Sequence, residues 1–140
     1  VVAGAALSAP DAQVQHREIL TWCGQADEGG GWIEKAMRLN PYHPERFWAH
    51  LARARFVARR YAEAEDALRR VSAPDALLLA LLAACEARQG KTDDARAHVA
   101  EALARTPPYT AQDCRASLHY RRAEDRQHHL DSLALAGLPA

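Results

Sequence analysis

Apolar residues recur at helical spacing along most of the chain. Between Pro44 and Pro74 they form two runs, the first from Phe47 to Ala58 and the second from Ala64 to Val71. Within each run they fall on one face of a helix and leave the opposite face polar. The basic pair Arg59 and Arg60 separates the runs, where positive side chains complement the negative end of a helix dipole. The pattern predicts two helices joined by a short turn, which is a helical hairpin.

The hairpin pattern repeats along the chain. Three prolines that each follow a helical segment lie at intervals of 33 residues, namely Pro41, Pro74 and Pro107. A period of this length is typical of stacked helical repeats. We therefore expect a single all-α domain, 1–140, with hairpins at about 10–43, 44–75 and 76–109. The first hairpin is degenerate, with a helix from Asp11 to Cys23 and a turn at Gly24.

Small residues occupy matching positions in the hairpins. A large residue is followed 16 residues later by alanine in two units, as Trp48 to Ala64 and Leu79 to Ala95. We expect these alanines, with Ala52 and Ala83, to lie where paired helices approach most closely, because a larger side chain would push the axes apart. Each hairpin cannot bury its apolar face alone, so the pattern predicts a stack.

The sequence pattern in the region 110–140 predicts two more helices. Thr110 can cap a short helix that runs to about His119. A final helix from about Glu124 to Ala136 ends at Gly137, which can adopt the left-handed conformation of a helix C-terminus, as can Gly90 in the turn of the third hairpin. We interpret the final helix as a cap that covers the last hairpin.

The order of large, small and proline positions resembles the tetratricopeptide repeat (TPR), with its residues at Trp48, Leu51, Ala52, Ala64, Leu68 and Pro74. The segments WIEKAMRLNPYHPERFW, from Trp32, and HHLDSLALAGLPA, at the C-terminal end, resemble a more specific bacterial group. In it, TPRs follow a class III adenylate or guanylate cyclase domain, or a winged-helix DNA-binding domain. The resemblance covers about 28–139 and implies a cytoplasmic regulatory or interaction module attached to an output domain.

The sequence departs from the TPR pattern at two positions. Arg55 and Glu86 stand where tyrosine is usual. Because equivalent positions on stacked first helices are neighbours, we expect these two side chains to approach each other across the interface between repeats.

Bulk properties disfavour a nucleic-acid partner and a membrane span. Lys plus Arg and Asp plus Glu number 18 each, which disfavours nucleic acid as a partner. The longest apolar run, Ala76 to Cys85, has ten residues and is too short to cross a bilayer. The start of the chain lacks Met and a signal-peptide pattern, so we expect it to be part of a longer protein. Three widely spaced cysteines fit a reducing, cytoplasmic setting.

No motif predicts catalysis or a cofactor. The candidate metal ligands are His119, Asp125, His128 and His129, with Cys114 nearby. His128 and His129 diverge by roughly a hundred degrees on a helix, and zinc needs three or four convergent ligands. We therefore interpret this set as solvated polar positions on the capping helix and expect neither a metal site nor an enzyme, although a small metal-dependent enzyme is the rival interpretation.

Two other features have structural interpretations. Cys85 lies in the middle of an apolar helix, which favours a small buried filler over a nucleophile. The run from Gly29 to Gly31 lacks the lysine and strand of a phosphate-binding loop. We interpret the glycine run as a place where two helices approach closely, or as one that relaxes the start of the second helix.

In a stack of TPR-like hairpins the first helices line the concave side, which cradles a peptide or a partner's helix. The predicted partner-binding residues are Glu18, Trp22, Arg46, Arg53, Phe56 and Arg88. Three of them form a basic stripe, for which an acidic peptide or a C-terminal carboxylate is the natural ligand. The alternative is that these arginines are an ordinary solvated face. A second alternative is homodimerisation through Val14, Ile19 and Trp22 of the first hairpin.

Overall fold

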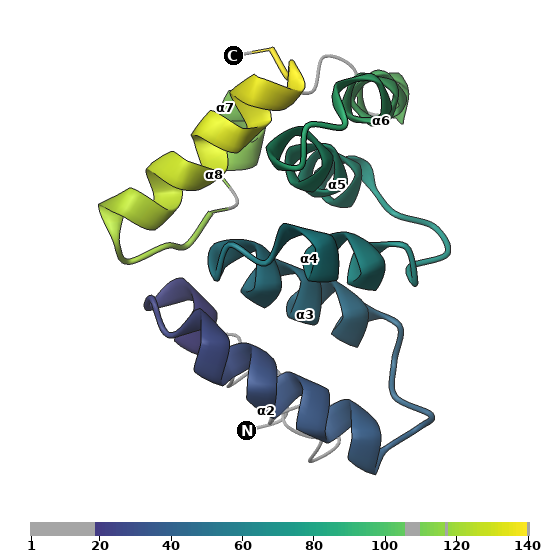
Figure 1. Ribbon diagram of the computed structural model, residues 1–140, viewed down its shortest axis with the longest axis vertical. Coiled ribbons are helices and arrows are strands. Elements are labelled where there is room, and N and C mark those ends of the chain that lie inside the picture. The colour runs from purple at the N-terminus through teal and green to yellow at the C-terminus, as the bar shows by residue number, and fades with distance from the viewer. Residues whose placement is uncertain (1–18, 106–109, 117, 140) are drawn as a thin grey trace, which may run out of the picture.

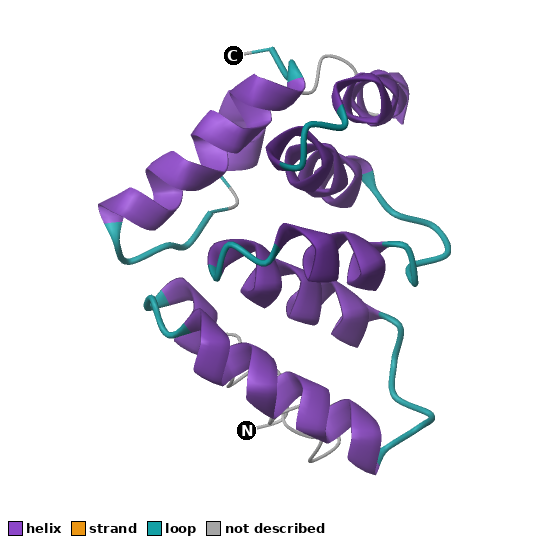
Figure 2. Cartoon of the chain, in the orientation of Figure 1, coloured by secondary structure: helices purple, strands orange, loops and turns teal. Residues whose placement is uncertain are grey.

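The computed structural model describes residues 19–105, 110–116 and 118–139, and these residues form helices and loops without a strand (Figure 2). After the end of a helix at residues 19–22, the helices are α2 (Ala26–Leu39), α3 (Arg46–Val57), α4 (Tyr61–Leu68), α5 (Ala76–Arg88), α6 (Thr92–Arg105), α7 (Ala111–Arg115) and α8 (Ala123–Ala136). The predicted all-α class is confirmed. In the described part of the chain, no helix has the length and apolar character needed to cross a membrane.

Helices α2 to α6 pack as adjacent pairs. Each packs against the next helix in the chain, so they form successive layers from α2 at one end to α6 at the other (Figure 1). Helix α8 breaks this order, because it turns back and packs mainly along α5, with lighter contacts to α6 and α7. Within the last helix pair it therefore packs chiefly on α5. It lies on the side of α5, however, and reaches back toward α3.

Helix ends lie close to where the sequence predicts them. Gly90 and Gly137 have φ angles of 80° and 95°, in the left-handed region that glycine adopts without strain. Thr110 caps α7 through a capping box with Asp113, although α7 ends at Arg115 and not at the predicted His119. Arg59, in the predicted basic hinge, has a φ of 67°. The turn between α3 and α4 therefore reverses direction without a glycine.

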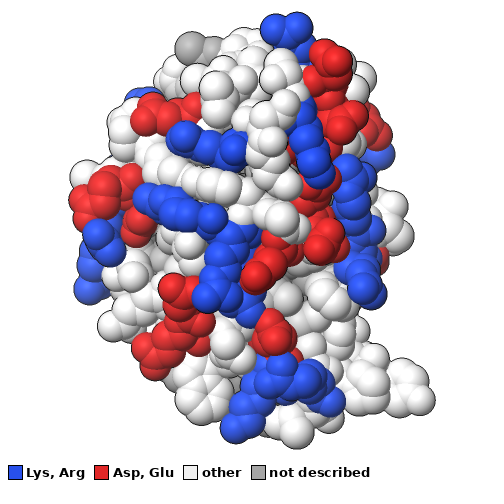
Figure 3. Space-filling view, viewed as in Figure 1, with Lys and Arg blue, Asp and Glu red and all other residues white. Residues whose placement is uncertain are grey.

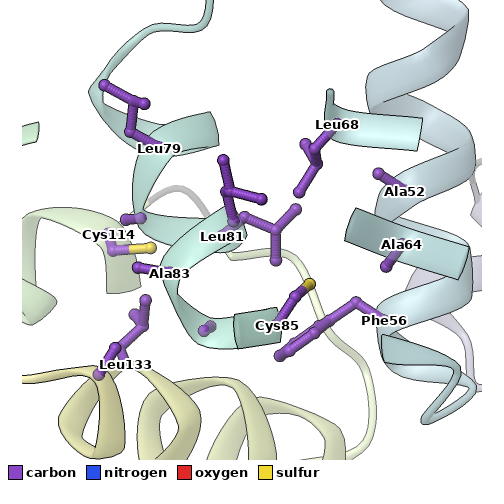
Figure 4. Close-up of a cluster of buried hydrophobic side chains, with 14 of the residues drawn as sticks. Ala52, Phe56, Ala64, Leu68, Leu79, Leu81, Ala83, Cys85, Cys114 and Leu133 are labelled. Atoms are coloured by element: carbon purple, nitrogen blue, oxygen red, sulfur yellow. The ribbon is translucent and has the colours of Figure 1, made fainter. Parts of the chain in front are cut away.

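Alanines line the centre of the core. Ala52, Ala64, Ala83 and Ala95 have no exposed surface, as expected for the points where paired helices approach most closely. Gly30 of the glycine run has the same role, because a Cβ atom on it would lie 3.3 Å from the Cβ of Ala54 on α3, whereas Gly31 faces open space. Leu68 of α4 and Leu81 of α5 occupy the space between these helices (Figure 4). Small side chains set the helix spacing, and leucines fill what remains.

Cys85 is the buried filler that the sequence predicts. It has no exposed surface and lies beside Phe56 of α3 (Figure 4). Burial, together with the nearby charges of Glu65 and Glu86, raises the pKa of the Cys85 thiol. The thiol is therefore protonated at neutral pH and is not a nucleophile.

Two buried glutamates tie α4, α5 and α6 together, and we call them and their partners the glutamate network. Glu65 accepts hydrogen bonds from Arg69, Gln89 and Lys91, at 2.7 to 3.1 Å. Glu86 has no exposed surface and pairs with Arg69 at 3.2 Å and with His98 at 2.6 Å. The network joins three consecutive helices through hydrogen-bonded and ion-paired side chains, although burial of Glu86 outweighs its partners and raises its pKa.

The predicted approach of Arg55 and Glu86 is wrong. Arg55 pairs with Glu34 of α2 and with Glu63 of α4, and Glu86 has its partners within the glutamate network. Long side chains at these positions reach the neighbouring helices in the chain before they reach each other.

On the face shown in Figure 3, positive and negative side chains interleave and do not separate into a basic and an acidic side.

Candidate functional site

The candidate site is the surface formed by Trp22 and by the sides of α3 and α5 that are turned toward the C-terminal segment. We call this surface the inner face. Four of the predicted partner-binding residues belong to it: Trp22, Arg53, Phe56 and Arg88. The C-terminal segment 118–136, which includes α8, lies on this face. The contact between the two is called the α8 contact below.

At one end of the inner face, the loop before α8 crosses Trp22. The Tyr120 ring lies edge-on at 4.6 Å and the His119 ring at 5.4 Å from the Trp22 ring, centroid to centroid. The Arg121 amide donates to the Trp22 carbonyl oxygen at 2.8 Å. The Arg53 guanidinium covers the indole ring at 5.0 Å, in a cation–π arrangement. Trp22 is therefore partly covered by the chain's own C-terminal segment.

In the middle, two histidines of α8 pack on Phe56. Phe56 has no exposed surface, and its ring centroid lies 4.8 Å from that of His128 and 5.0 Å from that of His129. His128 Nε2 is hydrogen-bonded to the Tyr61 hydroxyl at 2.7 Å, and His129 Nδ1 to the Tyr120 hydroxyl at 2.9 Å. The two rings bond to different hydroxyls, but both pack on Phe56, so they lie closer together than the divergence of adjacent helix positions predicts.

Polar side chains bridge α8 to α5 at the far end of the inner face, and to the turn after α3 at the beginning of α8. Arg88 Nε donates to Ser132 Oγ at 2.7 Å, and this hydroxyl donates to the His128 carbonyl oxygen at 2.7 Å. Asp125 lies between two arginines, 3.8 Å from Arg59 Nη1 and 4.0 Å from Arg122 Nε. Leu133 points from α8 toward Ala83 of α5 and Cys114 of α7 (Figure 4).

The three arginines of the predicted basic stripe have different surroundings in the structure. Arg88 bonds to Ser132 of α8, Arg53 lies over the Trp22 ring, and Phe56 is covered by the histidines. Arg46 is exposed near the Phe47 ring and takes no part in the α8 contact described above. Glu18 and Val14 lie outside the described residues. Ile19 is 54 % exposed, whereas Trp22 is half-buried under Tyr120.

The interpretation of the candidate metal ligands as solvated holds for His119, which is exposed, and is wrong for Asp125 and His129 on α8. Asp125 is only 5 % exposed, His129 2 %, and Ser132 not at all. Their spacing of four and three residues places them on one face of α8, the face that meets α5. That spacing was the available signal. It is hard to recognise because the residues are polar at positions where a helix packed on a core usually carries leucine.

Burial keeps both histidines neutral. Burial lowers the pKa of His128 to about 4, and the positive charges of Arg59 and Arg88 act in the same direction. Burial likewise lowers the pKa of His129 to about 3, with further contributions from Arg53 and His128. Both rings therefore act as neutral hydrogen-bonding groups at pH 7. Burial also raises the pKa of the Tyr120 hydroxyl, so that it remains protonated.

Two polar atoms of α8 are buried without a hydrogen-bond partner. They are Asp125 Oδ2 and His128 Nδ1. An unsatisfied buried polar atom costs about 1–3 kcal/mol. The arginines near Asp125 are too distant to donate a hydrogen bond to it. The α8 contact is thus held by specific hydrogen bonds, but two of the buried polar atoms of α8 have no hydrogen-bond partner.

Two cavities open beside the helices. One, of about 450 Å³, lies next to the α8 contact and is lined by the first turn of α2, the end of α3, Arg122 and Asp125. The other, of about 430 Å³, lies on α2, α3 and α4 around Trp48 and Leu51, with Arg70 over the Trp48 ring at 5.0 Å. In ranges 19–105, 110–116 and 118–139, no group of three His, Cys, Asp or Glu side chains is arranged to hold a metal ion.

No protein-family model, no curated protein and no solved structure matches the chain. The function is therefore argued from the geometry of the inner face and of the helix pairs.

Proposed function

We propose that the chain is a non-catalytic protein-interaction module, built from three TPR-like hairpins, whose inner face binds a segment of a partner protein. Adjacent helix pairs with fully buried alanines at equivalent positions support this assignment. One observation carries the proposal: a helix, α8, lies on the inner face, so this face accepts a helical segment.

The chemistry of the inner face suits recognition by both apolar and polar contacts. Phe56 supplies a flat apolar floor, and Arg53 and Arg88 lie at its two ends. Aromatic and arginine side chains are the residue types that most often dominate binding energy at protein interfaces. Arginine also pairs with carboxylates in two-pronged fashion, which favours an acidic segment as the partner. The resemblance to cyclase-linked TPR proteins suggests that such binding regulates an output domain in a cytoplasmic signalling protein.

The test is selection of binders from a random peptide library displayed on phage, with the full chain immobilised. Selected peptides should share a sequence pattern and bind the chain with micromolar affinity in calorimetry. The double variant Arg53→Glu and Arg88→Glu should weaken that binding at least tenfold, with helical content unchanged. Arg96→Glu, at an exposed position on α6, is the matched control and should leave the affinity unchanged.

Two results would contradict the proposal. The first is a selection that yields no shared pattern. The second is a binder whose affinity is the same for the double variant and the Arg96 control, because such a binder would use another surface.

A further inference from the structure

The cavity of about 450 Å³ lies where the first turn of α2, the end of α3 and the start of α8 come together, on the left of Figure 1. Charged side chains of both signs line it: the arginines Arg59 and Arg122, and the carboxylates Asp27, Glu28 and Asp125. Two of these charges have close partners outside the lining. Asp27 pairs with Arg60 at 3.3 Å, and Arg122 pairs with Glu124 at 2.6 Å.

Arg59 occupies a backbone position that favours glycine. Three turns between helices have a left-handed residue two positions before the next helix, namely Gly24, Arg59 and Gly90, with φ angles of 90°, 67° and 80°. Glycine adopts this conformation without strain, and arginine does not. Strained residues of this kind occur preferentially at functional sites. Here the strained residue contributes its side chain to the lining of the cavity.

Asp125 contributes a hydrogen-bond acceptor that lacks a donor. It is 5 % exposed, and among the described residues its Oδ2 atom has no hydrogen-bond partner. Arg59 Nη1 is 3.8 Å from Oδ1, and Arg122 Nε is 4.0 Å from Oδ2, which is too far for a hydrogen bond. Arg59 donates instead to the Val57 carbonyl oxygen, and its guanidinium has further N–H groups. Donors and an acceptor thus line the same cavity.

The start of α2 adds backbone donors to the lining. Gln25 is the N-cap residue, and within the described part of the chain its side chain makes no capping bond. The first amides of a helix have no partner within that helix, and they favour an anionic group.

A ligand with one charge would match this lining poorly. An anion alone would leave Asp125 without a donor, and a cation alone would meet both Arg59 and Arg122. An α-amino acid carries a carboxylate and an ammonium on the same carbon atom, so it matches both kinds of group.

We propose that this cavity binds a free α-amino acid. The carboxylate of the ligand accepts hydrogen bonds from the Arg59 guanidinium and from the first amides of α2, and its ammonium donates to Asp125 Oδ2. The ligand therefore joins the end of α3 to the start of α8. The four residues of the inner face named above do not line the cavity, so this inference is independent of the proposed function.

The test follows the amide chemical shifts of the isotope-labelled full chain by NMR. Each of the twenty standard amino acids is added singly, up to millimolar concentration. At least one should shift the amides of residues 24–28 and 57–59 saturably, and the absence of such shifts with all twenty would overturn the proposal.

The amino acid that binds most tightly is then compared with two derivatives. Its amide keeps the ammonium without the carboxylate, and its analogue without the amino group keeps the carboxylate alone. Each should bind at least tenfold more weakly. Equal binding of either derivative would overturn the requirement for both charges.

Variants of the full chain test the two side chains. Arg59→Gly removes the guanidinium and gives the turn the residue that its φ favours, so the chain stays folded. Arg59→Gly and Asp125→Asn should each weaken binding at least tenfold. Asp131→Asn makes the same change at an exposed position of α8 outside the cavity, and it should leave the affinity unchanged. Unchanged affinity in Arg59→Gly or Asp125→Asn would overturn the site.

A second measurement uses the wild-type chain. A saturating concentration of the ligand should slow amide exchange in residues 123–136 at least threefold, because the ligand binds only while α8 is packed. Unchanged exchange would overturn the contact between the ligand and Asp125.

Discussion

Two buried polar regions of this molecule use the same kinds of side chain and are completed to different degrees. In the glutamate network, Glu65 accepts from three donors, and Glu86 is paired on both sides. In the α8 contact, Asp125 and His128 each retain a buried atom without a hydrogen-bond partner. Buried polar networks stabilise a fold when all their members are bonded and lose that advantage when they are partly bonded. From this comparison we expect the helices of the glutamate network to be the more stable part and α8 to be the part that opens more readily.

The two regions also respond to acid in different pH ranges. Burial works to raise the pKa of Glu65, but hydrogen bonds from Lys91, Arg69 and Gln89 outweigh it and lower that pKa to about 2. A lowered carboxyl pKa gives stability that is present above about pH 4.5 and is lost as the pH falls toward 2. The histidine pKa values of about 4 and 3 are lowered from 6.5, so the α8 contact weakens as the pH falls below 6.5.

The largest expected effects come from truncating one leucine in each region. Leu81→Ala and Leu133→Ala each remove a buried side chain, for which the expected cost is about 2–5 kcal/mol. Leu81 lies between α4 and α5, so its loss should lower the midpoint of global unfolding in urea. Leu133 belongs to the α8 contact, so its loss should mainly accelerate amide exchange in residues 123–136. If Leu133→Ala lowers the global midpoint as much as Leu81→Ala does, α8 is part of the same cooperative unit.

Acid should release α8 before it affects the helix pairs. His129 has a pKa of about 3 while α8 is packed and the reference value of 6.5 when α8 is free, so at pH 4 it is protonated only in the free state. This preference for the free state weakens the α8 contact by about 3 kcal/mol. The groups that face the two histidines are Arg53, Arg59, Arg88, Asp131, Tyr61, Tyr120 and Cys114. Amide exchange measured from pH 7 to pH 3 should show residues 123–136 opening first.

The control for acid release is His129→Gln, which can keep a hydrogen bond to the Tyr120 hydroxyl and cannot be protonated in this range. This variant should retain the α8 contact to lower pH than the wild-type chain does. Simultaneous opening of α8 and of the helices in the glutamate network would contradict the distinction between the two regions.

Local sequence was sufficient to predict the helices, their adjacent pairing and several helix ends. Gly90, Gly137 and Thr110 each act through their own backbone conformation or a bond within the same turn, so their effect is visible in a few neighbouring residues. The buried alanines were predictable because the periodic positions in the pattern mark the helix faces that meet. The repeat assignment itself stays a prediction.

The candidate site was predictable only in part. Sequence reasoning selected Trp22, Arg53, Phe56 and Arg88 as one surface, but it did not place α8 on that surface. The placement depends on contacts such as that of Phe56 with His128, between residues far apart in the chain. The buried side of α8 carries polar residues, so hydrophobic periodicity misassigned it to solvent. Arg55 was misassigned because a long side chain can reach several neighbouring helices.

Two matched variants, each of which neutralises one carboxylate, test the comparison between the glutamate network and the α8 contact. Glu65→Gln weakens hydrogen bonds to Arg69, Gln89 and Lys91, so it should lower the free energy of unfolding by about 1–3 kcal/mol. Asp125→Asn removes a charge whose nearest arginine nitrogens are 3.8 and 4.0 Å away, so its cost should stay below about 1 kcal/mol. Urea denaturation at pH 7 measures both. A larger loss for Asp125→Asn would mean that the α8 contact depends on this carboxylate.

The smallest expected effect comes from one hydroxyl that links α8 to the inner face. Ser132→Ala removes the acceptor of the Arg88 Nε bond and the donor to the His128 carbonyl oxygen. The net loss should be about 1 kcal/mol, which corresponds to an approximately fivefold increase in α8 opening by amide exchange. Ala134→Ser, at an exposed position of the same helix, controls for the change in helix propensity and should leave that opening nearly unchanged. Because Arg88 is freed when Ser132 is truncated, the same variant should bind an acidic peptide more tightly than the control, and equal binding would show that this bond does not restrain α8.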